Sequence, residues 1–371
     1  MVRLGDVCTV VSGSTPKTNI PEYWDGDIKW ITPAELNEDS FYLFDSQRHI
    51  TEIGREKTGL CFMPAGTVIL SSRAPIGKTA IAGCELCCNQ GFKNLICSDA
   101  IFNEYLYYFL RSKTDYLNSL GRGATFKEIS KSIVENIEIR LPTLEEQKQV
   151  AKQFKHIYHL ISLRKQQLAK LDELVKARFV EMFGDRWANN LGWPQKPLKD
   201  CATFYNGKAH EQVVDENGEY ILVTSKCIAS DQREYRRTNT LLFPLQSGDI
   251  CMVMSDVPNG RALAKCMMIN EDNRYTLNQR ICCLRGYSLH PVFFMHVLNR
   301  HEFFLSFNDG DSQTNLRKDD LLSCPIILPP MELQEQFAAF VEQTDKSKLD
   351  VQQSLNKLEI LKKALMQKYF G

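Results

Sequence analysis

The chain has 371 residues, and its 45 lysines and arginines balance 45 aspartates and glutamates, so its formal net charge at pH 7 is zero. This length exceeds that of one ordinary domain, and 43% apolar with 24% charged residues is typical of a globular protein, which excludes a disordered or fibrous one. The balanced charge also excludes a uniformly basic nucleic-acid binder, so a DNA-binding face would need its cations gathered on one side.

The sequence predicts neither a membrane span nor an export signal. No apolar run approaches the roughly 20 residues that cross a bilayer, and residues 1–6 lack the apolar stretch of a signal peptide. We therefore expect a cytoplasmic protein in which the 13 cysteines stay reduced. Cys84, Cys87 and Cys88 include one CxxC spacing, but no second pair and no paired histidines accompany it, so no metal site is predicted.

The first globular region is predicted to cover residues 1–142. The apolar run 67–70 is typical of a strand, and 102–110 is typical of a buried helix. Serine, threonine, glycine and proline at 12–16 predict a turn. We expect a mixed α/β domain of the α+β kind.

A long spacer helix is predicted for residues 143–186. Thr143 and Glu146 have the spacing of a capping box, and Gly184 stands where a helix would end. About 40 helical residues would span about 60 Å. Apolar residues recur at spacings of three and four, which indicates a coiled-coil-like stripe; they are Leu168, Leu171, Val175 and Met182.

The rest of the chain follows the same order. Residues 187–329 are predicted to form a second globular region, with strand-like runs at 249–254 and 326–328. A second spacer helix is predicted for 330–371, with Pro330 in its first turn. Its apolar stripe consists of Val351, Leu355, Leu358 and Leu365.

The two halves are copies of one another. Residues 141–184 align with 328–371 without a gap, and 15 of the 44 aligned residues are identical, against about three expected by chance. Shared landmarks continue upstream, including Gly13 with Gly207 and Asn89-Gln90 with Asn278-Gln279. The sequence therefore predicts a pseudo-twofold internal repeat.

Two arrangements of the spacer helices remain open. Each helix could pack only on its own globular region, as an ordinary amphipathic helix does. Alternatively, the two helices pack on each other, antiparallel, as a spacer between domains. The second arrangement would relate the halves by a twofold axis, which suits the dyad character of duplex DNA.

Known catalytic motifs are missing. The sequence has no phosphate-binding G-x-x-x-x-G-K-[ST] loop, no H-E-x-x-H, no G-x-S-x-G and no methyltransferase fingerprint. Glu146-Gln147-Lys148 resembles a nuclease E-x-K only superficially, because it lies at a predicted helix start. These absences favour binding over catalysis.

Basic and amide side chains in turn-rich segments are the candidate DNA contacts, because cations neutralise phosphates or bind guanine and amides pair with adenine. In the first half they are Ser14, Thr15, Lys17, Lys29, Arg73, Lys78, Lys93, Arg122 and Lys127. In the second half they are Lys208, Lys226, Arg233, Arg236, Arg237, Arg261, Arg274, Asn315, Arg317 and Lys318. Each one, taken singly, could equally be an ordinary solvated charge.

Two clusters favour binding more than single residues do. Residues 233–237 place Tyr235 among three arginines, and 121–127 form a glycine-containing cationic loop. Trp24 and Trp30 are expected to pack beside strands instead of contacting bases. The repeated Asn-Gln pairs are expected to support the scaffold, since two halves that bind different sequences would not share base-reading amides.

The order of these landmarks looks like that of the specificity subunit of type I restriction-modification enzymes. The resemblance covers essentially the whole chain, and the duplicated order is its most specific part. The segments that carry it are Leu4-Gly5-Asp6, Ser12-Gly13-Ser14-Thr15-Pro16, Trp30-Ile31-Thr32, residues 66–73, Gly77, Asn89-Gln90 and Leu141-Pro142-x4-Gln147, the last repeated as Leu328-Pro329-x4-Gln334.

The resemblance implies a non-catalytic DNA reader. Each globular region would be a target-recognition domain for one half of a bipartite site in double-stranded DNA. The helices would set the gap between the half-sites and dock two methyltransferase subunits, with restriction endonuclease subunits outside them. S-adenosylmethionine, magnesium and ATP would belong to those partners. The divergent segments 35–57 and 226–242 would carry base readout.

One departure and two alternatives accompany this interpretation. The segment 190–194 resembles a family lead-in that has no counterpart before the first domain, so contacts of an N-terminal extension are in doubt. The chain could instead be the target-recognition region of a fused methyltransferase-nuclease. It could also be a coiled-coil scaffold whose domains bind protein.

Overall fold

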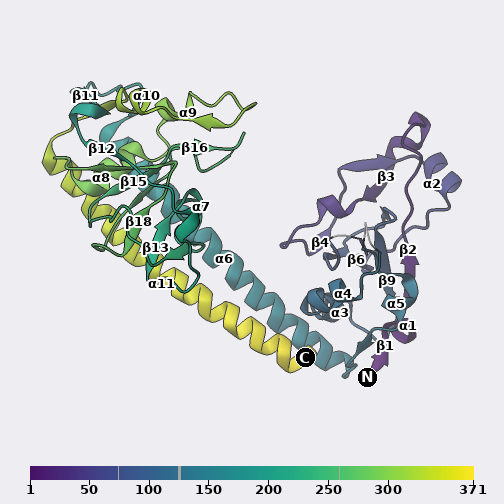
Figure 1. Ribbon diagram of the computed structural model, residues 1–371. Helices are drawn as coiled ribbons and strands as arrows, with labels where there is room; N and C mark the ends of the chain where they lie inside the picture. Colours follow the sequence, from purple (N-terminus) through teal and green to yellow (C-terminus); the bar gives the residue numbers. More distant parts are fainter. Residues whose placement is uncertain (74, 124–126, 259) are drawn as a thin grey trace. The chain divides into compact units, whose positions relative to one another are not determined.

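The computed structural model describes residues 1–73, 75–123, 127–258 and 260–371 (Figure 1). The chain divides into two compact units. Unit 1 consists of Met1–Lys165 and Gln353–Gly371, and unit 2 consists of Gln166–Gln352.

Two sheets of unit 1 have three or more strands. The larger has the strand order β2 (Cys8–Ser12), β9 (Phe92–Cys97), β6 (Val68–Ser71), β7 (Thr79–Ala82) and β4 (Tyr42–Leu43). Its pairs are antiparallel except for β4, which runs parallel to β7. The smaller has the order β5 (Arg48–Ile50), β3 (Trp24–Ile31) and β8 (Cys87–Cys88), with β3 and β8 parallel.

Short helices complete unit 1. Its core is the face of the larger sheet that packs on α3 (Asn103–Ser112), whose residues Tyr105–Leu110 are all buried, as the sequence predicted for 102–110. The other elements are β1 (Val2–Arg3) paired with β10 (Glu138–Ile139), η1 (Pro21–Tyr23), η2 (Pro33–Glu35), α1 (Leu4–Val7), α2 (Glu52–Thr58), α4 (Thr114–Leu120) and α5 (Lys131–Glu135).

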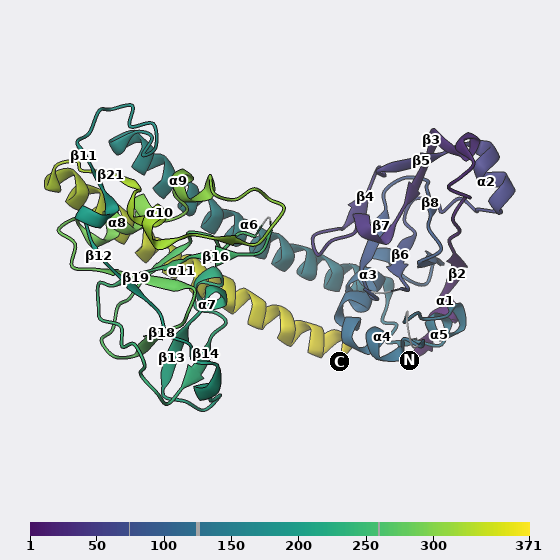
Figure 2. The same cartoon turned by 45° about the horizontal axis from the view of Figure 1, so that its top comes forward.

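Unit 2 repeats this plan (Figure 2). Its larger sheet has the order β12 (Thr203–Asn206), β19 (Ile281–Arg285), β15 (Ile250–Val253) and β17 (Cys266–Met268). Its smaller sheet has the order β14 (Arg236–Thr238), β13 (Tyr220–Val223) and β18 (Tyr275–Leu277), and β13 and β18 are parallel. The other elements are β11 (Gln195–Pro197) paired with β21 (Pro325–Ile327), β16 (Ser255–Asp256) paired with β20 (Thr314–Asn315), η3 (Leu198–Asp200), η4 (Glu211–Val213), α7 (Ser225–Ala229), α8 (Pro291–Leu298), α9 (Glu302–Leu305) and α10 (Lys318–Leu322).

The internal repeat is therefore confirmed at the level of the fold. The order β2-β9-β6-β7 in unit 1 corresponds to β12-β19-β15-β17 in unit 2, and each smaller sheet joins one parallel and one antiparallel pair. The units differ at one edge, because β4 adds a fifth strand beside β7 in unit 1 and the sheet of unit 2 ends at β17.

Two helices of 40 residues each, α6 (Leu144–Phe183) and α11 (Met331–Phe370), extend from one unit into the other. The predicted capping box starts α6, since the Glu146 carboxylate accepts hydrogen bonds from both the backbone N–H and the hydroxyl of Thr143. At its other end Gly184 has φ +74°, a left-handed conformation that favours glycine.

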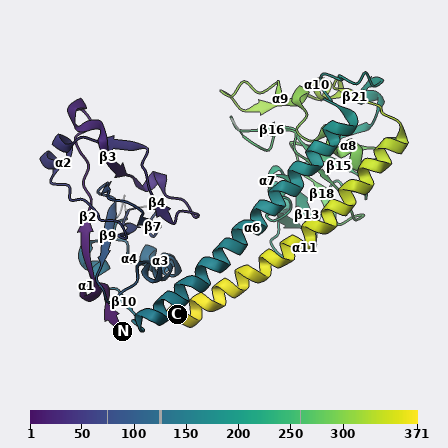
Figure 3. The same ribbon diagram turned by 180° about the vertical axis from the view of Figure 1, so that it is seen from behind.

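Within each unit the two helical segments run antiparallel (Figure 3). In unit 1, Tyr369 Oη donates to Gln153 Oε1 (3.1 Å), and Arg164 Nε donates to Ser354 Oγ (3.2 Å). In unit 2, Lys348 pairs with Asp172 at 2.8 Å, while the rings of Phe183 and Phe337 lie 5.6 Å apart. The prediction that the helices pack on each other is confirmed.

The predicted stripe lies along these helices. Val175, Val351 and Leu355 are buried. The other five predicted stripe residues, which are Leu168, Leu171, Met182, Leu358 and Leu365, are half-buried. The apolar stripe is therefore only partly buried: three of its eight residues are buried and the other five are half-buried.

A buried glutamine attaches each helix to its globular region. Gln147 Oε1 accepts from the Phe102 backbone N–H (2.8 Å), and its Nε2 donates to the carbonyl of Pro142 (2.9 Å). Gln334 makes the same two bonds, to the N–H of His290 (2.9 Å) and the carbonyl of Pro329 (2.8 Å). This geometry explains why Leu-Pro-x4-Gln is repeated.

All thirteen cysteines are unpaired, and most are buried in sheets. Over the described ranges, no group of three or more histidine, cysteine or acidic residues has the geometry to hold a metal ion. In the same part of the chain, no helix is both long and apolar enough to cross a membrane.

Candidate nucleic-acid interface

The predicted turn after β2 is held by a close backbone crossing. A Cβ atom on Gly13 would lie 2.1 Å from the carbonyl oxygen of Asn89, so only glycine can stand there. The Asn89 side chain donates to Thr15 Oγ1 (2.8 Å), and the Ser14 N–H donates to the carbonyl of Cys88 (3.0 Å). Two predicted contacts, Ser14 and Thr15, are thus fixed in place by the strand pair beneath them.

Unit 2 has the same crossing. A Cβ atom on Gly207 would lie 1.9 Å from the carbonyl oxygen of Asn278, and Lys208 forms a bridge with Asn278. The repeated glycine and asparagine therefore shape the backbone in both units, as the sequence indicated. Lys208 itself is exposed at this crossing.

Four residues of unit 1 form a cluster that we call the Glu128 cluster: Arg73, Lys93, Arg122 and Glu128. Arg73 Nε and Lys93 Nζ lie 3.0 and 3.1 Å from the two carboxylate oxygens of Glu128, and the Arg122 backbone pairs with that of Glu128. Burial raises the pKa of the Glu128 carboxyl, but hydrogen bonds from Arg73 and Lys93 outweigh it and hold that pKa below its ordinary value. With three cations to one carboxylate, the cluster is positively charged.

The structure thus brings together three predicted contacts that are far apart in sequence. Arg73 and Arg122 are exposed, whereas Lys93 is buried and acts through its ion pair with Glu128. Lys127, the residue directly before Glu128, is exposed. Residues 124–126 of the predicted cationic loop lie outside the described residues.

The other basic candidates of unit 1 stand apart from the Glu128 cluster. Lys78 Nζ donates to the carbonyls of Pro33 (3.2 Å) and Leu36 (2.6 Å), so its ammonium group stabilises the backbone of residues 33–36. Lys17 is exposed after the β2 turn, and Lys29 is half-exposed on β3.

Both tryptophans of this region are buried, as expected of packing residues. Trp24 Nε1 donates to the carbonyl of Lys17, and Trp30 Nε1 donates to that of Ser14. Arg48, which the sequence analysis missed, is exposed and lies 3.6 Å from the ring centroid of Trp24. Its signal was the alternation of Arg48 with buried Ile50 on a short strand.

In unit 2 the predicted arginine and tyrosine cluster lies on edge strand β14 and the turn before it. Arg236 is exposed, and Arg237 donates to the carbonyl of Gly218 (3.2 Å) while lying 5.3 Å from the ring centroid of Tyr235. Lys226 forms an ion pair with Glu234 at 2.6 Å, and Arg233 Nε donates to the carbonyl of Ser230 (2.9 Å). This edge therefore presents a mixed cationic and aromatic surface.

The strand pair β16–β20 corresponds to the Glu128 cluster but carries different side chains. Asn315 is paired with Ser255 there, in the places that Glu128 and Arg73 occupy in unit 1. The strand register places Cys282 where unit 1 has Lys93. Residue 259, two positions before Arg261 in the sequence, lies outside the described residues.

The remaining candidates of unit 2 are all exposed. Arg317 and Lys318 adjoin Asn315 at the start of α10, with Lys318 5.6 Å from the ring centroid of Phe204. Arg274 is paired with Glu271, and Arg261 follows the β16 turn. Arg280, which the sequence analysis missed, is also exposed and has φ +68°.

The comparisons with known proteins agree with this architecture. The family profile described as "Type I restriction modification DNA specificity domain" matches residues 1–173 and 190–360. The MjaIX specificity subunit of Methanocaldococcus jannaschii is 30% identical, over 99% of this chain and 91% of that protein. The MjaVIII specificity subunit of the same organism is 23% identical, over 99% and 90%.

Two solved structures share the fold. A chain from a structure titled for complex assembly and conformational transition of the type I R-M system aligns with TM-score 0.63 and 19% identity, covering 100% of this chain and 96% of that one. The type I S subunit from M. genitalium aligns with TM-score 0.57 and 14% identity, covering 100% and 95%. Because the profile and the MjaIX relative both cover nearly the whole sequence, the chain belongs to the family of type I restriction-modification specificity subunits, with two target-recognition domains.

Proposed function

We propose that each globular region reads one part of a bipartite site in double-stranded DNA, and that the paired helices set the gap between the two parts. One observation carries the proposal: the same scaffold occurs twice with different side chains at equivalent places. Unit 1 has Arg73, Glu128 and Lys93 where unit 2 has Ser255, Asn315 and Cys282. A duplicated frame with divergent contacts suits a site whose two halves differ in sequence.

The chain would act within a larger complex. The helices would dock two methyltransferase subunits, and restriction endonuclease subunits would join outside them. Catalysis would belong to these partners, together with S-adenosylmethionine, magnesium and ATP. The zero net charge supports a division of labour in which partners contribute much of the phosphate attraction.

A segment exchange tests the assignment of half-sites. Residues 226–242, which contain all but the first residue of α7 and the whole of β14, would be replaced by the equivalent segment of another specificity subunit, and the variant would be expressed with its methyltransferase. Mapping methylated bases in the host genome should show one half-site altered and the other unchanged. Exchange of residues 35–57 is the matched experiment and should alter the opposite half-site.

Two outcomes would contradict the proposal. An active complex whose methylated sequence is unchanged by either exchange would show that these segments do not select bases. A change in both half-sites from one exchange would show that the halves do not read DNA separately.

A further inference from the structure

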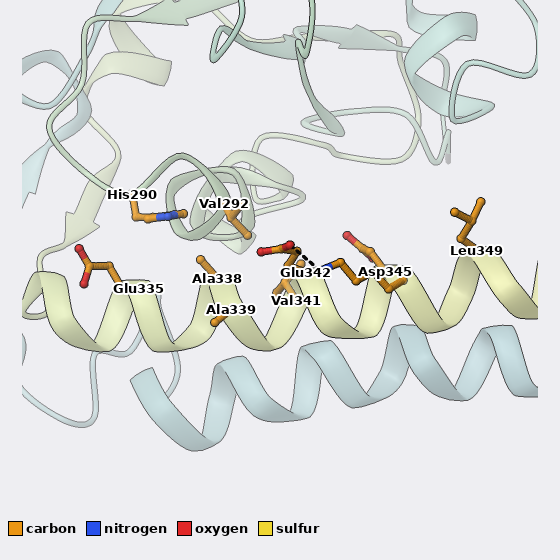
Figure 4. A pocket seen from close by; sticks show the side chains of 10 residues that line it. His290, Val292, Glu335, Ala338, Ala339, Val341, Glu342, Asp345 and Leu349 are labelled. Carbon is orange, nitrogen blue, oxygen red and sulfur yellow. Dashed lines mark hydrogen bonds and ion pairs between the residues drawn. The ribbon is translucent and has the colours of Figure 1, made fainter.

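A groove of about 600 Å³ opens between the start of α8 and one face of α11, entirely within unit 2 (Figure 4). Val292 and Ala338 form its apolar wall, and Glu335, Glu342 and Asp345 line its rim. Figure 4 shows Glu335, Ala338, Glu342 and Asp345 along the face of α11 that looks toward α8, with Val292 opposite them on α8. The groove therefore has an apolar wall beside acidic groups.

The equivalent place in unit 1 is filled by the chain itself. The Phe41 ring lies 4.9 Å from that of Tyr107, and Lys155 Nζ lies 5.3 Å from the Phe41 ring centroid. The neighbouring Tyr42 donates its hydroxyl proton to Glu104 Oε1 (3.1 Å). An extended segment thus seats two aromatic side chains against α3 and α6.

The repeat identifies the matching positions in unit 2. The buried glutamines bind the N–H of Phe102 and of His290 alike, which pairs Glu104 with Val292. The constant offset of 187 residues along the helices pairs Lys155 with Glu342 and Tyr158 with Asp345. The polar and aromatic surface that receives Phe41 and Tyr42 has been replaced by an apolar wall and carboxylates.

The sheet edge beside this place also differs between the units, because a strand covers it in unit 1 and none does in the described part of unit 2. In unit 1 the carbonyls of Phe41 and Leu43 accept hydrogen bonds from Ile81 and Gly83 (both 2.7 Å), which adds β4 to β7. The strand register makes Met268 on β17 the counterpart of Ile81. Over the described ranges β17 has no strand beyond it, so unit 2 has an open edge next to the groove.

The charge of the groove selects the occupant. Glu335, Glu342 and Asp345 face a single lining cation, Lys346, which is paired with Glu342 at 2.8 Å. Unit 1 has Lys148, Lys155 and Tyr158 at the three equivalent positions. An acidic rim repels DNA and attracts lysine or arginine.

We propose that this groove binds an extended segment of a protein partner, one that carries an aromatic residue and a lysine or arginine. The segment adds a strand parallel to β17, as β4 does to β7, and seats its aromatic side chain against Val292 and Ala338 with its cation beside Glu342. This contact goes beyond the proposed function, which has the helices dock methyltransferase subunits but assigns no occupant to this groove and no added strand to β17.

A labelled peptide tests the proposal on the full chain. The probe is Lys-Ser-Phe-Tyr-Leu-Phe-Lys, which is the sequence 40–44 flanked by lysines, and binding is followed by fluorescence anisotropy. It should bind the wild-type chain, and the same peptide flanked by glutamates should bind at least tenfold more weakly. Reversing the rim with Glu342→Lys and Asp345→Lys should also weaken the lysine peptide about tenfold, a change of about 1.4 kcal/mol.

Glu173→Lys is the matched control, because Glu173 is exposed on α6 and lies outside the groove. This variant should bind the lysine peptide as the wild type does. The rim carboxylates are well exposed, so their reversal should leave the melting temperature unchanged.

Three results would overturn the proposal. They are no binding of the lysine peptide to the wild type, equal binding by the rim and control variants, and self-association of the chain that the rim reversal abolishes. The last would make a second copy the occupant. The methylated DNA sequence reports on base reading and not on this groove, so failure of either proposal can be recognised separately.

Discussion

Two glutamines show how much a repeat can reveal about single residues. Gln147 and Gln334 are nearly inaccessible to solvent, and each accepts from one backbone N–H and donates to the carbonyl of the proline five residues before it. Gln147 also donates to the carbonyl of Ala100 (3.1 Å). Their repetition identified them in the sequence. Their partners could not be predicted, because Phe102 and His290 lie about 45 residues upstream and only the folded chain brings them close.

Removal of the Gln334 amide should destabilise unit 2. Gln334→Ala leaves the His290 N–H and the Pro329 carbonyl buried without partners, which should lower the free energy of unfolding by about 1–3 kcal/mol. Urea denaturation measures the loss. Gln336→Ala, two residues away and exposed, should change stability by less than about 0.5 kcal/mol.

The buried imidazole of His301 should make unit 2 sensitive to acid. Burial, reinforced by the charge of Arg186, lowers the pKa of His301 from 6.5 to about 4. As the pH falls, His301 in the unfolded chain becomes protonated near pH 6.5, whereas His301 in the folded unit becomes protonated only near pH 4. Stability present above pH 6.5 is therefore lost as the pH falls, by about 3 kcal/mol across that interval.

The predicted loss of stability in acid can be checked by measuring the melting temperatures of the wild type and of His301→Asn between pH 7 and pH 4. Asparagine keeps an acceptor for the Phe303 N–H, which His301 Nδ1 now accepts, but it cannot take up a proton in this range. The variant should show a shallower loss of stability. Parallel curves for the two proteins would assign the acid sensitivity to other groups.

The candidate DNA contacts of unit 1 illustrate what sequence cannot provide. Arg73, Lys93 and Arg122 are separated by up to 49 residues, and only the pairing of strands and loops around Glu128 joins them. Lys78 was equally basic in the sequence, yet its ammonium group binds two carbonyls inside a loop. The residue types were enough to predict that these side chains are positively charged. Which group each charge binds could not be predicted, because it depends on tertiary contacts.

At the scale of elements, each long helix ends in an aromatic anchor. In unit 2 the Phe183 ring lies 4.7 Å from that of Phe293, and in unit 1 the Phe370 ring lies 5.2 Å from that of Tyr105. The sequence showed both phenylalanines as repeated residues, and the stripe of spacings predicted the packed face. The anchors were missed because the periodicity of a helix does not reveal which core its end enters.

Phe183→Ala should destabilise unit 2 by about 3–5 kcal/mol, because it removes a fully buried ring among three other phenylalanines. Hydrogen exchange should show lost protection in β19 and little change in β9. Val180→Ala, on the same helix turn but exposed, is the control and should cost less than about 0.5 kcal/mol. Equal losses in both strands would show that the two units unfold as one.

The strand β4 was not predicted either. Phe41-Tyr42-Leu43 is a short apolar run without alternation, and nothing local distinguishes it from a loop. It becomes a strand because β7 offers backbone hydrogen bonds and α3 offers aromatic surface. Such a strand is stabilised by its neighbours more than by its own residues.

At the scale of the whole molecule, the duplication was the most reliable prediction. An identical order of landmarks fixed two copies of one topology and two long helices before any contact was known. The apolar stripes also indicated that the helices could pack on one another, which was one of the two arrangements that the sequence left open. The exact pairing, such as Asp172 with Lys348, required the structure.

The helix pairing changes how the gap should be engineered. An extra turn in α6 alone would shift its register against α11, so a matched insertion is needed in both. Adding seven residues after Lys165 and seven before Gln353 preserves the stripe and lengthens each helix by about 10 Å, close to three base pairs. The methylated sites should keep both half-sites and gain about three base pairs between them.

Genome-wide methylation mapping measures that gap directly. A chain carrying the insertion in α6 only is the control, and it should lose methylation because its helices cannot pair in register. An active double insertion with an unchanged gap would show that the helices do not set the spacing.

The composition of unit 1 also bears on how the protein is made. Its core needs Phe370, which packs on Tyr105, Phe109 and Phe154. During translation residues 1–165 leave the ribosome before Phe370 has been made, so those three aromatic rings stay uncovered until residue 370 has been added. Unit 2, built from one uninterrupted stretch, can close earlier. Termination before residue 370 would thus leave an exposed apolar surface for chaperones and proteases to recognise.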